Sequence, residues 1–341
     1  MRAVQLTRFR APLVEIQLPD PEPGPGEILI LVRAAGICHS DAHYRSGLGN
    51  IALPRTPGHE VSGVVARCGP GVLSPAVGTR VAVHYLLSCG ICDRCRSAGE
   101  QFCRTGAMIG KERDGGYAEA IVVPAGNAVP MPESVSFEHA AVMMCSTATA
   151  FHALRLANFS SGETVAIIGF GGLGASALQL TGILGAGRVV VLDVVAEKLA
   201  QAERLGAIAI DPRVENLEDA LLLATDRHGI DVALDFAGQP ATTSAVLRSL
   251  APRGRLTMVA LATTCPAINP YRDLVAKEAS VIGCSDHLRT ELVELLDLAG
   301  TGALDLSSAV ADTLPLDAVA INAALDDLDA GTPRLRRVIL P

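Results

Sequence analysis

A strand that runs into a glycine-rich turn and then into a helix limits most strongly what this chain can fold into. Residues 163–174 read Glu-Thr-Val-Ala-Ile-Ile-Gly-Phe-Gly-Gly-Leu-Gly, and a regular alternation of apolar runs and helical segments follows. The expected strands are 164–169, 188–193, 231–237 and 256–261, and the expected helices are 173–184 and 196–205. Apolar strands of this length, separated by helices, indicate an α/β fold with a doubly wound parallel sheet buried on both faces.

The sequence on either side of this region has a different character. Residues 27–34, 58–68 and 79–84 are short strand-like runs punctuated by Gly and Pro. Residues 137–156 predict one long, mostly buried helix that Ser136 caps. The tail contains two helical stretches and a final strand at 337–340 that can return to the first domain. We therefore expect two domains: residues 1–149 with 287–341, and residues 150–286.

The glycine-rich turn has the context that a dinucleotide site requires. Gly169, Gly171 and Gly174 follow an expected strand and open an expected helix. They allow the backbone, including Gly172 and Leu173, to approach a pyrophosphate at the helix N-terminus. Asp193 ends the next strand about 20 residues further on, where a carboxylate accepts hydrogen bonds from the ribose and repels a 2′-phosphate. The pattern favours NAD over NADP; the alternative is a solvated carboxylate at a strand end.

Four cysteines fall within one short segment, Cys89-Gly-Ile-Cys92-Asp-Arg-Cys95 followed by Cys103. Four thiolates close a tetrahedron around zinc with Zn–S distances of about 2.3 Å and leave no open position, so the expected role is structural. The alternative is a chance cluster of free cysteines, which this spacing makes unlikely. The chain has nine cysteines in 341 residues, and an odd number speaks against a disulfide framework.

Composition excludes several classes of partner. The net charge is −8, which argues against nucleic acid or an anionic membrane as the main partner. Aromatic residues make up 3% of the chain and there is no Trp, so base-stacking platforms are not expected. No apolar run is long enough to predict a membrane span, and the N-terminus lacks the pattern of a signal peptide. A cytoplasmic location is the default expectation.

Further motifs carry a resemblance to a known family. They are the segments Cys38-His-Ser-Asp, Gly58-His-Glu, Asp114-Gly-Gly-Tyr-Ala-Glu and Cys145-x-x-x-Thr149, together with the four-cysteine segment and the glycine-rich turn. With these motifs the chain resembles the zinc-containing medium-chain dehydrogenase/reductase superfamily, in its alcohol dehydrogenase branch. The resemblance implies a GroES-like β-rich catalytic domain and a Rossmann cofactor domain.

The resemblance also assigns residues to a catalytic zinc. It implies that Cys38, His59 and Cys145 ligate the metal and that Glu60 approaches it when water is exchanged. Two Cys and one His leave the fourth position open for water or substrate. Asp41 would orient the zinc-bound imidazole by hydrogen bonding. Taken singly, Cys145 also reads as a small buried hydrophobic residue and His59 as a loop histidine.

Proton transfer and cofactor contacts follow from the same resemblance. Ser40 would take the proton of the substrate and pass it through the cofactor ribose towards His43. The implied cofactor contacts are His39 and Arg337 to the pyrophosphate, Thr149 to the nicotinamide and Lys198 to the ribose. The alternative for both histidines is an ordinary surface position.

The resemblance implies a reversible, NAD-linked oxidation of primary and secondary alcohols, with one catalytic and one structural zinc per chain. It also implies a homo-oligomer, with a tetramer favoured over a dimer. The polyol-dehydrogenase branch usually has a carboxylate where this chain has Cys145, which favours simple alcohols. A polyol or other hydroxy-compound dehydrogenase remains an alternative, and a non-catalytic zinc-bearing scaffold is a distant one.

Overall fold

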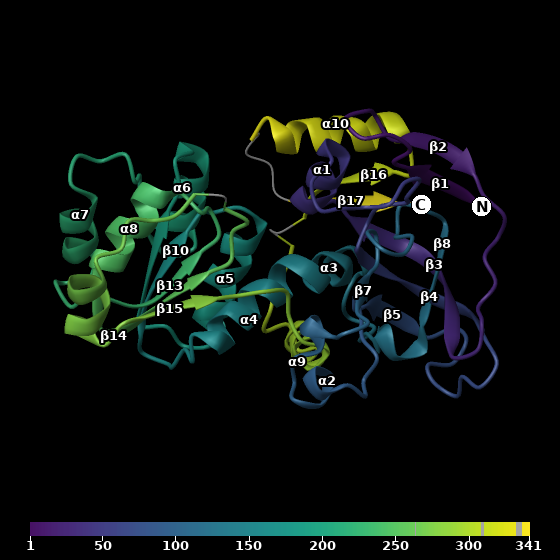
Figure 1. Cartoon of the computed structure of the whole chain (residues 1–341), viewed down its shortest axis with the longest axis horizontal. Coiled ribbons are helices and arrows are strands. Elements are labelled where there is room, and N and C mark those ends of the chain that lie inside the picture. The colour runs from purple at the N-terminus through teal and green to yellow at the C-terminus, as the bar shows by residue number, and fades with distance from the viewer. Residues whose placement is uncertain (263, 308–309, 332–335) are drawn as a thin grey trace. The chain divides into compact units, whose positions relative to one another are not determined.

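Contacts in the computed structural model divide the chain into two units, Met1–Ala148 with Leu288–Pro341, and Thr149–His287. The structure describes residues 1–262, 264–307, 310–331 and 336–341. Each unit has its own sheet, and the two are described separately below (Figure 1).

The first unit is built on a seven-stranded sheet whose central strand is β3, Glu27–Gly36. Apolar residues of β3 are buried along most of its length, as the alternating sequence predicts. The sheet order is β16-β17-β3-β4-β5-β9, with β8 also paired to β3. The remaining strands are β4 (Glu60–Cys68), β5 (Arg80–Val83), β8 (Ala120–Pro124), β9 (Ala128–Pro130), β16 (Val310–Pro315) and β17 (Arg336–Leu340).

The final strand does return to the first domain. Strand β17 runs antiparallel to β3, with Val338 opposite Gly36, so the last described segment of the chain lies beside the strand that leads to Cys38. Two small sheets and several helices, besides the helical stretch that begins at Phe137, also lie in this unit. They are β1 (Arg2–Gln5) with β2 (Val14–Gln17), β6 (Leu86–Leu87) with β7 (Ala107–Met108), α1 (His39–Ser46), α2 (Asp93–Arg96), α9 (Arg289–Gly300) and α10 (Ala318–Asp329).

The second unit confirms the predicted doubly wound parallel sheet. Its six strands run in the order β12-β11-β10-β13-β14-β15, and every pair is parallel. The strands are β10 (Thr164–Ile168), β11 (Arg188–Leu192), β12 (Ile208–Ile210), β13 (Ile230–Asp235), β14 (Leu250–Met258) and β15 (Ser280–Gly283). The helices that alternate with these strands are α5 (Gly172–Ile183), α6 (Ala196–Arg204), α7 (Leu217–Ala224) and α8 (Pro240–Arg248). The order reverses between β10 and β13, where such folds bind ligands at the carboxyl ends of the strands.

The long helix predicted over 137–156 is interrupted. It consists of α3 (Phe137–Val142), a π-helical turn at Met143–Thr147, and α4 (Ala148–Leu156). Ser136 caps α3 as expected, because its hydroxyl accepts a hydrogen bond from the His139 amide at 3.2 Å. A π turn inserts one residue into the helical repeat and is frequent at functional sites. The sequence pattern did not predict this turn, which contains Cys145.

Candidate metal centres and cofactor site

Four potential metal ligands from three distant segments meet in the first unit. One ligand atom of each of Cys38, His59, Glu60 and Cys145 lies within 4.8 Å of those of the other three. Cys38 is the N-cap of α1, His59 and Glu60 lie at the start of β4, and Cys145 lies in the π turn. The Sγ atoms of Cys38 and Cys145 are 3.9 Å apart. Two thiols and an imidazole are the donors of a catalytic zinc site that keeps an open position.

The buried polar atoms of this cluster favour a bound cation. Within the described residues, neither buried carboxylate oxygen of Glu60 accepts a hydrogen bond, although Arg336 forms an ion pair with Oε1. Buried polar atoms without partners are costly unless a ligand satisfies them. Nδ1 of His59 lies 3.8 Å from Asp41 Oδ1, which leaves Nε2 for the metal. These residues therefore fit a zinc ion.

The electrostatics of the cluster point the same way. The hydrogen bond from the Cys145 thiol, helped by the nearby Arg336 guanidinium, holds the pKa of Cys38 well below its usual value despite burial. The same hydrogen bond and burial raise the pKa of Cys145. Burial raises the pKa of Glu60 to about 7. Burial lowers the pKa of His59, but the Asp41 carboxylate and the Cys38 thiolate outweigh it and raise that pKa.

The second cysteine cluster is exposed and local in sequence. Cys89, Cys92, Cys95 and Cys103 each place their sulfur within 4.8 Å of the others. The segment, which we call the cysteine lobe (residues 89–103), contains the short helix α2 and a 3-10 turn at Glu100–Phe102, and no residue of either is buried. The amides of Cys92 and Cys89 donate to the sulfurs of Cys89 and Cys103, at 3.3 Å each. Four sulfurs with amide donors around them fit a structural zinc.

Hydrogen bonds polarise the lobe sulfurs unequally. The backbone amide of Arg104, followed by that of Cys95, lowers the pKa of Cys92 to about 6. Burial, together with hydrogen bonds to neighbouring sulfurs, raises the pKa of Cys95 to about 12. Their sulfurs are 3.5 Å apart, and this separation brings a thiolate next to a thiol. A metal ion that displaces the remaining protons would satisfy both.

The second unit contains the glycine-rich turn at the end of β10. A Cβ atom on Gly174 would lie 2.1 Å from the carbonyl oxygen of Gly169, so the turn closes only with glycine there. Asp193 lies directly against this turn. Its Oδ2 accepts from the amide of Phe170 at 2.7 Å, and its Oδ1 accepts from the amide of Val195 at 3.0 Å. Lys198 Nζ is 3.9 Å from the same carboxylate.

Comparison with known proteins agrees with this geometry. The family model described as "Alcohol dehydrogenase GroES-like domain" matches residues 24–133, and that described as "Zinc-binding dehydrogenase" matches residues 172–300. An alcohol dehydrogenase of Geobacillus stearothermophilus is 33% identical over 321 residues, which cover 93% of both chains. This chain belongs to the zinc-dependent medium-chain dehydrogenase/reductase superfamily, in its alcohol dehydrogenase branch.

Other members of the superfamily show its breadth. An L-threonine 3-dehydrogenase of Pyrococcus abyssi is 32% identical over 318 residues, which cover 91% of this chain and 90% of its own. The crystal structure of an NAD-dependent alcohol dehydrogenase superposes over the full length of both chains with a TM-score of 0.92 and 28% identity. The dehydrogenase described here is thus an oxidoreductase with a small-molecule substrate.

The residues of the predicted proton path lie on α1. Ser40 Oγ is 3.7 Å from Cys38 Sγ, and the rings of His39 and His43 are 4.8 Å apart between centroids. Burial, helped by His43, lowers the pKa of His39. Thr149 is buried on α4 and belongs to the second unit, as do Asp193 and Lys198.

Arg336 is a site residue that sequence reasoning missed. Its guanidinium lies 3.3 Å from Glu60 Oε1 and donates to the Ile37 carbonyl at 3.1 Å. The next residue, Arg337, which is predicted to contact the cofactor pyrophosphate, forms an ion pair with Asp327 of α10. Neighbouring residues of a strand point to opposite faces, so only one of the two arginines can face the metal cluster. The register of β17 against β3 was the missing signal.

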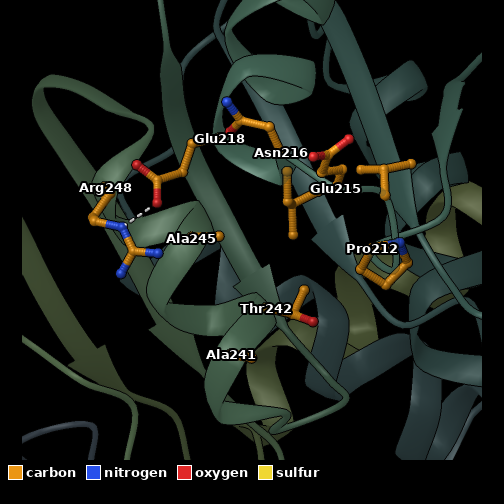
Figure 2. A pocket seen from close by; sticks show the side chains of 10 residues that line it. Pro212, Glu215, Asn216, Glu218, Ala241, Thr242, Ala245 and Arg248 are labelled. Atoms are coloured by element: carbon orange, nitrogen blue, oxygen red, sulfur yellow. Dashed lines mark hydrogen bonds and ion pairs between the residues drawn. The ribbon is translucent and has the colours of Figure 1, made fainter.

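The second unit also contains a cavity of about 250 Å³. The loop between β12 and α7 forms one side and α8 forms the other, with Pro212 at one end and the ion pair of Glu218 and Arg248 at the other (Figure 2). Arg213 in the same loop donates to the carbonyl of Val194 at 2.9 Å, so this loop touches the residue that follows Asp193.

Among the described residues, no helix combines the length and apolar character needed to cross a bilayer.

Proposed function

We propose that this chain is an NAD-dependent zinc alcohol dehydrogenase that reversibly oxidises primary and secondary alcohols to aldehydes and ketones. The convergence of Cys38, His59 and Cys145, buried beside Glu60, carries this proposal. These three residues would hold the catalytic zinc, and the cysteine lobe would hold a second, structural zinc. When bound, the catalytic zinc would act as a Lewis acid on the substrate oxygen and lower its pKa.

The protein's own residues handle the ligand geometry and the proton. Asp41 orients the imidazole of His59, because the carboxylate is buried and lies on its Nδ1 side. Ser40 would accept the substrate proton at Oγ, and His43, in the last turn of α1, would release it. Burial lowers the pKa of His39, whose ring centroid lies 4.8 Å from that of His43.

NAD is the cofactor that the second unit suits. The pyrophosphate would lie over Gly169–Gly174 at the N-terminus of α5, with Asp193 and Lys198 at the ribose. The cavity between the β12–α7 loop and α8 has space for the adenine ring, and its loop adjoins Val194 (Figure 2). Contacts of Thr149 with the nicotinamide and of His39 and Arg337 with the pyrophosphate stay predictions.

The test is a panel of alcohols and carbonyls assayed with NAD and with NADP. The protein is assayed as purified, after chelation, and after zinc is restored. We expect NAD-linked turnover of ethanol or benzyl alcohol that chelation abolishes and zinc restores. Turnover that persists after both metals are removed would contradict the zinc assignment. Absence of any NAD-linked activity in zinc-replete protein would instead favour the non-catalytic scaffold.

A polyol or other hydroxy-compound dehydrogenase is the second candidate. The L-threonine 3-dehydrogenase named above supports it, because that protein is as similar to this chain as the alcohol dehydrogenase is. Cys145 supports simple alcohols, because the polyol branch usually has a carboxylate there. Adding L-threonine and polyols to the panel distinguishes the two candidate functions. A kcat/KM for L-threonine or a polyol that is higher than that for simple alcohols would identify the second candidate.

We further propose a cytoplasmic homo-oligomer, with a tetramer favoured over a dimer. Strand β15 ends the six-stranded sheet, and an edge strand offers backbone groups for pairing with a second chain. Apolar side chains preceding it are exposed, including Leu261 at 82% and Tyr271 at 73%. All nine cysteines are free thiols, which suits a reducing compartment. Light scattering of the purified protein measures the mass of the assembly.

A further inference from the structure

One sequence motif has no role in the mechanism above, namely Asp114-Gly-Gly-Tyr117. In the structure this segment lies along residues 56–58, which lead directly into His59. Three backbone amides of the motif donate to three carbonyls there: Gly115 to Thr56 at 2.8 Å, Tyr117 to Pro57 at 3.1 Å and Gly116 to Gly58 at 2.7 Å. Hydrogen bonds therefore fix the backbone at each of residues 56–58, directly before the proposed zinc ligand His59.

A side-chain hydrogen bond and close packing reinforce these backbone hydrogen bonds. Asp114 Oδ1 accepts a hydrogen bond from the Thr56 amide at 2.9 Å. The two segments approach so closely that a Cβ atom on Gly115 would lie 2.2 Å from the carbonyl oxygen of Gly58. Gly58 itself has a φ of +94°, and a Cβ atom there would lie 2.4 Å from the Tyr117 ring. The pair of segments thus leaves His59 little freedom to shift.

Tyr117 reaches a second part of the ligand set. Its hydroxyl donates to Asp41 Oδ2 at 2.9 Å, and both side chains are almost fully buried. Asp41 also accepts from the amides of Cys38 at 2.9 Å and Gly58 at 3.3 Å. One carboxylate therefore connects Cys38, the chain before His59 and the Tyr117 hydroxyl.

We propose that the Asp114–Tyr117 segment is a positioning element for the catalytic metal ligands. It acts on His59 in two ways: through the backbone of residues 56–58, and through the hydrogen bond from the Tyr117 hydroxyl to the Asp41 carboxylate. The proposal rests on the proposed function, because it takes the buried cluster to be a metal site. Because these hydrogen bonds hold the Asp41 carboxylate, it keeps the His59 imidazole in the orientation that binds the metal. Loss of a hydrogen-bond partner of this kind, which contacts a ligand and not the metal itself, typically changes metal affinity by about 10–100-fold.

The experiment measures metal release from the zinc-loaded protein to a chromogenic chelator. Tyr117→Phe removes only the hydroxyl and keeps the ring that packs against Gly58. We expect zinc to leave the catalytic cluster about tenfold faster, the low end of the range for outer partners. Release from the cysteine lobe should keep its wild-type rate and so serves as an internal control. In cobalt-substituted protein, the visible absorption of the catalytic site should shift as well.

A matched control is Tyr44→Phe, which also removes a buried tyrosine hydroxyl from the first unit. That hydroxyl donates to the thioether of Met108 at 3.5 Å, not to Asp41. We expect both release rates to stay at the wild-type value in this variant.

Two results would overturn the positioning role. They are an unchanged release rate and cobalt spectrum in Tyr117→Phe, and an equal acceleration at both metal sites, which reports a general loss of stability. If the wild-type protein holds metal only in the cysteine lobe, the proposed function itself fails, and the positioning role fails with it. Metal content of the wild-type protein therefore separates the two failures.

Discussion

The two cysteine clusters use similar donors in opposite surroundings. The proposed catalytic cluster of Cys38, His59, Glu60 and Cys145 joins Cys38 to Cys145 across 107 residues of sequence, and all of it except the half-buried Cys145 is buried. The cysteine lobe joins Cys89 to Cys103 across 14 residues, with no buried residue in either of its helical turns. The fold therefore builds the catalytic cluster, whereas metal would hold the lobe in shape. Loss of metal from the first should cost activity, and loss from the second should cost stability.

The largest expected effect is on turnover. Cys38→Ser should remove one zinc per chain and lower kcat/KM by about 10³-fold or more, because a Lewis-acid metal contributes several kcal/mol to the transition state. Metal analysis and steady-state kinetics check this. Retained turnover with full zinc content would show that Cys38 is not a ligand.

Cys103→Ser should lower stability and leave turnover nearly unchanged. It should remove the other zinc and lower the free energy of unfolding by on the order of 4 kcal/mol, because the lobe has no core of its own. The initial kcat of freshly prepared protein should stay within a few-fold of the wild type. Thermal melts, limited proteolysis of residues 89–103 and initial rates measure both properties. A Cys103→Ser variant that is stable but inactive would contradict the assignment of stability to the cysteine lobe and of activity to the other cluster.

A smaller effect concerns pH. Burial raises the pKa of Glu60 from its ordinary value of 4.5 to about 7. In metal-free protein its contribution to stability is present below pH 4.5 and is lost as the pH rises through about 7. The loss is on the order of 3 kcal/mol. Glu60→Gln should remove this part of the pH dependence in denaturant titrations at pH 5 and 7.5. A variant with the wild-type slope would exclude Glu60 as its source.

The smallest effect should leave both clusters untouched. Asp193→Ala removes the carboxylate that would repel a 2′-phosphate, so the ratio of kcat/KM for NADP to that for NAD should rise by on the order of tenfold. Zinc content should stay close to the wild-type value, whereas the melting temperature should fall by about a few degrees because the amides of Phe170 and Val195 lose their acceptor. An unchanged cofactor ratio would remove Asp193 from cofactor selection.

Sequence reasoning predicted the local features better than the distant ones. The spacing of Cys89, Cys92, Cys95 and Cys103 predicts their cluster by itself, because all four lie on one short segment. Spacing alone does not join Cys38, His59 and Cys145, which required the resemblance to a family. The alternation of strands and helices predicted the parallel sheet of the second unit, and the structure adds the short edge strands β12 and β15.

The features that were missed depend on registration between distant segments. Arg336 and Arg337 are indistinguishable by composition, and only the pairing of β17 with β3 selects Arg336 for the cluster. The π turn at Met143–Thr147 lies in an apolar stretch where every position is compatible with a buried helix. Its extra residue changes the direction of Cys145, which no periodicity in the sequence indicates.

The bond from Arg336 to the Ile37 carbonyl spans 299 residues, and it has a consequence for biosynthesis. A nascent chain leaves the ribosome with Cys38, His59, Glu60 and Cys145 long before Arg336 is translated. Glu60 and the Cys38 thiolate are therefore made before Arg336, whose guanidinium balances their charge in the folded unit. Residues 149–287 can meanwhile fold as an autonomous insertion, which shortens the loop that β17 has to close. The order of translation thus makes the arginine the last component of the centre to arrive.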